Sequence, residues 1–164
     1  MSSNVSPDDR TDDRTFSAGG RSYDGAVDIA PLTPAHHEDA MALWRAVGLT
    51  RPWNDPDEDL RRAVRGPAST VLAGLDRAGG LVATAMVGHD GHRGWVYYLA
   101  VAPELRGRGL ARSMMHACER WVSERGIPKI QLMVRRDNEA AANFYEHLGY
   151  ESSDVTVLAR RLTE

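Results

Sequence analysis

The chain has 164 residues, of which 42% are hydrophobic and 26% charged, a composition typical of one soluble globular domain. The formal net charge of −3 disfavours nucleic-acid binding, because proteins that bind phosphate backbones usually carry a basic excess. No apolar run reaches the ~18 residues of a membrane helix, so we expect no membrane partner. The single cysteine, Cys118, excludes an internal disulfide framework, and the N-terminus shows no signal-peptide-like apolar stretch. These features predict a cytoplasmic protein.

The first 25 residues differ in composition from the rest of the chain. They are rich in Asp, Ser and Gly, poor in aliphatic residues, and contain the tandem DDRTDDRT at 8–15. Such a segment cannot bury enough apolar surface to offset its ordering entropy. We therefore predict a disordered tail over 1–25 and one domain over 26–164.

Caps and turn residues divide this domain into short elements. Thr33, Pro34 and Gly48, for example, are typical of the two ends of a helix. The predicted elements are a strand over 26–29, helices over 34–47 and 57–65, strands over 69–75, 81–88 and 95–101, a helix over 109–125, a strand over 129–134, a helix over 139–148 and a strand over 155–160. This order predicts an α/β fold with a mixed, mostly antiparallel sheet, at least one parallel crossover, and flanking helices.

The stretch RGRGLARSMM at 106–115 lies between the strand YYLAV and a helix. The first N–H groups of a helix are unpaired and lie at the positive end of its dipole, so they favour an anion. Gly107 and Gly109 lack the Cβ atoms that would block a pyrophosphate, and Arg106 and Arg108 add charge at its rim. Small Ala111 leaves space in the first turn.

The spacing Arg-x-x-Gly-x-Ala resembles the acyl-CoA pyrophosphate loop of the GNAT superfamily of N-acetyltransferases. One strand later, the segment NEAAANFYEHLGY supplies Asn138 and Tyr145 at the positions where that superfamily has an Asn and, seven residues on, a Tyr. The resemblance covers about residues 26–161. The segments RPWNDP, DGHRG and YYL are most similar to a small bacterial branch, the YpeA-like acetyltransferases.

The resemblance implies the GNAT fold and an acetyl-CoA-dependent acetyl transfer, without a metal, to a primary amine that attacks directly in a ternary complex. It implies that Tyr145 protonates the departing CoA thiolate. It also implies that the backbone of Leu99 and Val101 pairs with the pantetheine arm, which Asn138 hydrogen-bonds. The implied CoA-binding residues are Leu99, Val101, Arg106, Gly107, Arg108, Gly109, Leu110, Ala111 and Asn138. A core position on a helix face is the alternative for Tyr145.

At the position of the general base, this chain differs from the better-understood relatives. Ribosomal-protein N-terminal acetyltransferases have a Glu five residues before the Asn, and Met133 stands there in this chain. Tyr97 and Tyr98 are adjacent on a strand and should point to opposite faces, so we expect one of them to line the cleft.

The segment RPWNDP at 51–56 lies where GNAT proteins bind the acceptor. Trp53 could wall an amine pocket that includes Asn54, and Asp55 could hold or deprotonate a cationic amine. The alternative is that Trp53 is a core residue and that Asn54 or Asp55 only caps the next helix.

Two other interpretations compete with an enzyme. A catalytically silent acyl-CoA-binding sensor is compatible with Met133, and a nucleic-acid-binding module using Arg106, Arg108 and Arg112 is the weakest candidate. A metal site is not expected, because the histidines lack ligands at zinc-like spacing and the acidic run 55–59 lacks the glycine of a calcium loop. The expected partner is a small-molecule or peptide amine, and a homodimer is compatible with the sequence.

Overall fold

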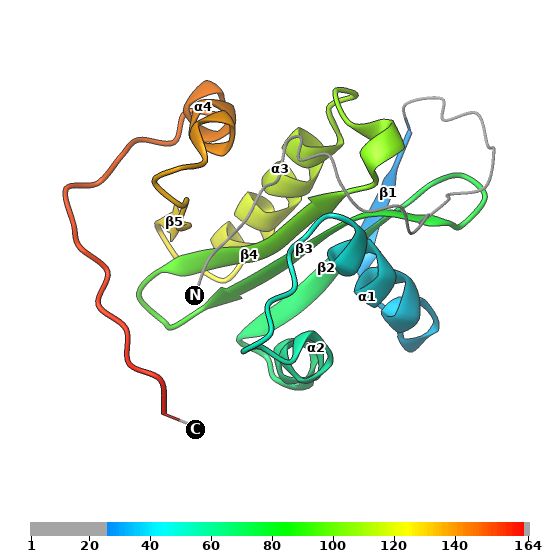
Figure 1. Cartoon of the computed structure of the whole chain (residues 1–164), viewed down its shortest axis with the longest axis horizontal. Helices are drawn as coiled ribbons and strands as arrows, with labels where there is room; N and C mark the ends of the chain where they lie inside the picture. The colour runs from blue at the N-terminus through cyan, green and yellow to red at the C-terminus, as the bar shows by residue number, and fades with distance from the viewer. Residues whose placement is uncertain (1–25, 163–164) are drawn as a thin grey trace.

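The computed structural model describes residues 26–162, which form a five-stranded sheet in the order β1-β2-β3-β4-β5 (Figure 1). The first four strands are an antiparallel meander, and β5 pairs parallel to β4. The strands are β1 (Asp28–Pro31), β2 (Ser69–Leu75), β3 (Leu81–His89), β4 (Gly94–Val101) and β5 (Ile130–Gln131). The α-helices are α1 (His37–Ala46), α2 (Pro56–Arg65), α3 (Leu110–Ser123) and α4 (Glu139–His147), with 3-10 turns η1 (Pro34–His36) and η2 (Pro103–Leu105). The predicted mixed sheet flanked by helices is confirmed.

The helices cover both faces of the sheet and produce two hydrophobic clusters (Figure 1). Trp44 of α1 and Leu60 of α2 pack with Val71 and Val82 in the first cluster. The second cluster joins α3 and α4 to the opposite face and includes Leu99, Met114, Cys118 and Tyr145. Strand β4 contributes to both clusters, so it lies between the two helical layers.

Three predicted elements differ from the structure. The first helix begins with η1, and the Thr33 side chain makes no capping hydrogen bond. The strand predicted over 129–134 is reduced to Ile130–Gln131, and the strand predicted over 155–160 does not form. A strand needs a partner ladder, and here the segment over 151–162 is exposed, including Val155, Val157 and Leu158. The disordered tail predicted over 1–25 lies outside the described residues.

Candidate active site

Strands β4 and β5 separate soon after they meet. Their ladder contains the pairs Gly94↔Ile130 and Trp95↔Gln131, and β4 then continues to Val101 without a further β5 pair. An extended ligand can add to an open strand edge through main-chain hydrogen bonds. Leu99 is buried and Val101 is half-buried on this part of β4, at the place where the sequence predicts pantetheine pairing.

The glycine loop leads from η2 into α3. Gly107 has φ +74° and Gly109 has φ +82°, in the left-handed region that side chains with a Cβ rarely adopt. A Cβ on either residue would meet no atom within 4 Å, so the backbone conformation, and not close packing, requires glycine here. The steric reason given from the sequence concerns a Cβ against a bound pyrophosphate and stays a prediction, and the open space is compatible with a bound phosphate.

Helix α3 begins directly after this loop. Gly109 is its N-cap, and no side chain caps the helix. The first-turn N–H groups can therefore face an anion, which the helix dipole also favours. Arg106 is half-buried, Arg108 and Gly107 are exposed, and Ala111 is half-buried. Leu110 is buried in the core, so its backbone is the part that can contact a ligand.

Helix α4 positions Asn138 and Tyr145. Asn138 is its N-cap, as predicted, and its Oδ1 accepts a 3.1 Å hydrogen bond from the Ala141 N–H. Tyr145 is only 3% exposed, and its hydroxyl has no hydrogen-bond partner in the described part of the chain. Burial raises the Tyr145 pKa, so this phenol stays protonated in neutral solution. A buried, unsatisfied hydroxyl is costly and calls for an explanation such as a ligand.

A cavity of about 460 Å³ lies beside α2 and the central strands. Its volume suits a small molecule. Trp53, Asn54, Tyr97 and Tyr98 line it, so the structure brings together four of the five residues predicted to contact the acceptor. Trp53 is 60% exposed and is therefore not a core residue. Among residues 26–162, the lining residues are Leu49, Arg51, Trp53, Asn54, Asp59, Arg62, Ala63, Ser69, Met86, Val87, Gly88, Tyr97, Tyr98 and Arg135.

Both tyrosines of β4 line this cavity, and the prediction that only one would do so is wrong. The register between β3 and β4 shifts between Thr84 and Met86, and Tyr98 has φ +50°. This irregularity is a β-bulge, which breaks the strict alternation of side chains along a strand. Tyr97 and Tyr98 can therefore share one side of the sheet.

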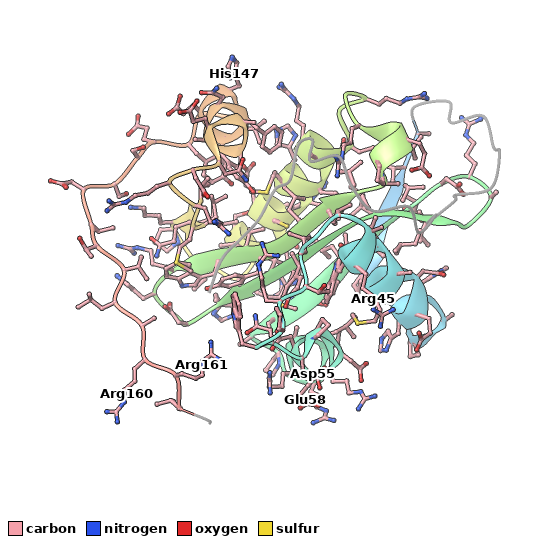
Figure 2. All side chains as sticks on the ribbon, in the orientation of Figure 1. Arg45, Asp55, Glu58, His147, Arg160 and Arg161 are labelled. Atoms are coloured by element: carbon pink, nitrogen blue, oxygen red, sulfur yellow. The ribbon has the colours of Figure 1, made fainter. Side chains whose placement is uncertain are left out.

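Asp55 lies outside the cavity lining and caps α2. Its Oδ1 accepts hydrogen bonds of 3.1 Å from the backbone N–H groups of Asp57 and Glu58. Figure 2 shows Asp55 beside α2 at the outer edge of the molecule. The structure therefore supports the capping alternative and not contact with an amine.

Asp59, which the sequence analysis missed, supplies the carboxylate of the cavity. Asp59, Arg62 and Ala63 have the i, i+3, i+4 spacing of one helix face, and all three line the cavity. This spacing is the sequence signal that could have pointed to Asp59, because Asp55 is the helix cap and Asp59 lies on the helix face that lines the cavity.

Tyr98 is held from two sides. Its hydroxyl donates a 2.9 Å hydrogen bond to Asp59 Oδ2, and its ring stacks on Trp44 with centroids 4.1 Å apart. Burial and the Asp59 contact raise the Tyr98 pKa. Arg62 donates to the other carboxylate oxygen of Asp59 at 2.5 Å. Both oxygens of Asp59 are thus hydrogen-bonded.

Among residues 26–162, no group of three or more His, Cys, Asp or Glu side chains could hold a metal ion. None of the helices in that range is long and apolar enough to cross a membrane.

The separating strand pair β4–β5, the glycine loop at the start of α3 and the cavity lined by β4 are the features expected from the resemblance to the GNAT acetyltransferases. The model of the acetyltransferase (GNAT) family matches residues 36–150, more than half of the chain. The chain belongs to this family, which confirms the resemblance at that level.

Solved structures of the same fold include an aminoglycoside N-acetyltransferase, AAC(6')-Iy, in complex with CoA. It is 17% identical, with a TM-score of 0.73, over 88% of this chain and 99% of that one. A ribosomal-protein-alanine N-acetyltransferase from Brucella melitensis biovar Abortus 2308 is 23% identical, with a TM-score of 0.67, over 83% and 100% of the two chains. Glucosamine-6-phosphate N-acetyltransferase from Arabidopsis thaliana is 16% identical, with a TM-score of 0.63, over 84% and 99%. At these identities the similarity confirms the fold alone.

Proposed function

We propose that the protein is an acetyl-CoA-dependent N-acetyltransferase that transfers an acetyl group to a primary amine by direct attack in a ternary complex. The observation that carries this proposal is the position of β4. Tyr97 and Tyr98 of this strand line the cavity, and the next residues, up to Val101, form the open edge beside β5. A donor on that edge and an acceptor in the cavity would therefore meet along one strand.

On the donor side, the residues present fit CoA. The start of α3 and the loop 106–109 offer backbone N–H groups and two arginines to a pyrophosphate. The open edge at Leu99 and Val101 suits an extended pantetheine arm, and Asn138 stands at the start of α4 where it could hydrogen-bond that arm. The YpeA-like branch and a cytoplasmic location are part of the same proposal, and both rest on the sequence.

In the proposed reaction, the amine nitrogen forms a bond to the acetyl carbonyl carbon and the C–S bond of the thioester breaks. A backbone N–H near Leu99 would polarise the carbonyl oxygen. Tyr145 would give its proton to the departing thiolate, which matches a buried hydroxyl without a protein partner. The attacking amine loses one proton, and the return of a proton through solvent to the Tyr145 phenolate restores the Tyr145 hydroxyl for the next turnover.

In the part of the cavity lined by described residues, one carboxylate could take the amine proton. Asp59 lines the wall with Tyr98, and the raised pKa of Tyr98 keeps this phenol protonated. We therefore assign the role of proton acceptor to Asp59. The strand position of the relatives' Glu is occupied by Met133, so the base is moved to α2 in this proposal.

Two measurements test the proposal. Calorimetry should detect CoA binding, and a free-thiol assay with acetyl-CoA should show thiol release that depends on an added primary amine. Binding of CoA without transfer to any amine would identify an acyl-CoA-binding sensor. Absence of CoA binding would contradict both readings.

A further inference from the structure

The charges of the cavity define a class of acceptor. We infer that the acceptor carries, next to its primary amine, an anionic group, a carboxylate or a phosphate, and that Arg51 binds this group. This inference rests on the proposed function and concerns the same cavity. It differs from a polycationic acceptor such as an aminoglycoside, the substrate class named for one protein of the same fold.

Positive side chains dominate the cavity lining. Arg51, Arg62 and Arg135 are cationic, and Asp59 is the anionic member of the lining. Arg161, in the exposed C-terminal segment, places its guanidinium carbon 5.9 Å from the centre of the Trp53 ring and so adds another cation near the cavity. Figure 2 shows the Arg161 side chain on this segment, at the side of the molecule that carries α2.

Two of the lining arginines already have carboxylate partners. Arg62 pairs with Asp59 at 2.5 Å, and Glu58 lies 3.8 Å from it. Arg135 makes a bidentate pair with Asp137, with hydrogen bonds of 3.0 and 2.7 Å. Their charges are therefore largely compensated within the protein.

Arg51 differs, because its contacts are to backbone carbonyls. Its Nη1 donates to the carbonyl oxygens of Gly48 at 2.8 Å and Thr50 at 3.1 Å. These bonds hold the side chain in place without neutralising its charge, and a guanidinium has five N–H donors in total. Arg51 can thus offer further N–H groups to a carboxylate or phosphate, the groups that arginine binds most specifically.

Asp59 is the single carboxylate among the described lining residues, and this limits how much positive charge an acceptor can bring. Asp59 Oδ2 accepts from Tyr98 and Oδ1 from Arg62, so its negative charge is already shared. Several ammonium groups in this cavity would face the arginines without compensation, which disfavours polycations. One amine beside cationic groups has a lowered pKa and is more often in the neutral form that attacks. An anionic group on the same molecule would offset the repulsion at Arg51.

Matched pairs of amines test the inference with the full-length protein. Each pair differs in the anionic group: β-alanine and propylamine, phosphoethanolamine and ethanolamine, phenylalanine and phenethylamine. Spermidine serves as the polycation. With saturating acetyl-CoA, the thiol-release assay should give at least one pair in which the anionic member has a roughly tenfold or greater advantage in kcat/KM, equal to about 1.4 kcal/mol. The pair that responds distinguishes carboxylate from phosphate.

Variants locate the effect. Arg51→Gln should remove most of the advantage of the anionic member, and Arg51→Lys should keep part of it. Arg45→Gln is the matched control, because Arg45 is exposed on α1 outside the cavity lining. An advantage that persists in Arg51→Gln, or is lost equally in Arg45→Gln, would overturn the role of Arg51.

A binding measurement tests the inference even where turnover is too slow for the thiol-release assay. In the presence of CoA, the anionic amine should raise the melting temperature of the wild type and not of Arg51→Gln. Equal kcat/KM within every pair, or spermidine as the best acceptor, would overturn the inference and leave the transferase function standing. Failure of every anionic amine to react or to bind would also overturn it. The proposed function fails separately, through the absence of CoA binding.

Discussion

The Tyr98 hydroxyl and the Asp59 carboxylate, 39 residues apart in sequence, form a 2.9 Å hydrogen bond that joins β4 to α2. The bond depends on the β-bulge, because φ +50° at Tyr98 accompanies the turn of this side chain toward the cavity. It fixes the carboxylate beside the strand that would carry the donor. The cavity in which we propose that the acceptor binds is thus positioned by one strained residue and one helix.

Replacing Tyr98 by Phe should weaken the acceptor site. The change removes one of the two hydrogen-bond partners of Asp59, and a hydrogen bond to a charged group contributes about 1.5–3 kcal/mol. We expect kcat/KM for the amine to fall about 10-fold or more, while the Kd for CoA stays unchanged in calorimetry. Tyr97→Phe is the comparison, because Tyr97 lines the same cavity and its hydroxyl donates no hydrogen bond to a carboxylate within residues 26–162. Equal losses in both variants would contradict a specific role for the Asp59 bond.

Trp44 supports Tyr98 from the core. Its Nε1–H donates to Thr84 Oγ1 at 2.8 Å, and the Thr84 hydroxyl donates to the Tyr98 carbonyl at 3.2 Å. Trp44→Phe should destabilise the protein by about 2–3 kcal/mol, through a smaller ring and a lost buried hydrogen bond. Urea unfolding measures this loss. Thr84→Val removes both hydrogen bonds with less change in volume, so a smaller effect there would assign most of the loss to packing.

The sequence predicted most elements because their signals are local. Glycines and caps delimit β2 and α4. The helical periodicity of the apolar residues in α3 places Met114 and Cys118 on its buried face. The loop 106–109 and Asn138 were singled out because their spacing resembles a pattern of the family to which the chain belongs. Their roles in binding stay predictions.

Non-local features could not be predicted in this way. The bulge at Tyr98 arises from the pairing of β3 with β4, so it is invisible in the β4 sequence alone. The segment over 155–160 has strand-forming residues, yet strand formation depends on a neighbouring ladder that β5 does not provide here. Asp59 was overlooked because its importance comes from Tyr98, which contacts it only in the folded chain.

Gly109→Val should separate CoA binding from folding. Gly109 has φ +82°, which a β-branched residue adopts only with strain, so the loop before α3 should change shape. We expect CoA affinity to fall at least 10-fold, measured by calorimetry. Gly126→Val is the matched control, since Gly126 has φ +74° and equally open surroundings beyond the other end of α3. Similar CoA affinities in the two variants would contradict the pyrophosphate placement.

Stability should fall in alkaline solution. Burial, together with Glu119, raises the pKa of Cys118 from 9.0 to about 12 and also raises the pKa of Tyr150 above 10.0. Above these unfolded-state values the unfolded chain loses protons that the native protein keeps, so the free energy of unfolding decreases as pH rises. The decrease should begin near pH 9 and steepen above pH 10. Urea unfolding at pH 8 to 11 measures it, and Cys118→Ala should remove the part that begins near pH 9. A free energy of unfolding that stays constant up to pH 11 would contradict this assignment.

Tyr145→Phe gives two expected effects of opposite sign. The Tyr145 hydroxyl is buried and has no hydrogen-bond partner among residues 26–162. Its removal should therefore leave the melting temperature unchanged or raise it, since an unsatisfied buried group costs about 1–3 kcal/mol. The ring contacts with Phe144 and Tyr150 are kept. If the hydroxyl protonates the thiolate, kcat should fall roughly 10²-fold or more while the Kd for CoA changes little. Thermal melts, the thiol-release assay and calorimetry on the same preparation measure the three quantities. A lower melting temperature with an unchanged kcat would mean that the hydroxyl has a structural role, and would remove Tyr145 from the proposed mechanism.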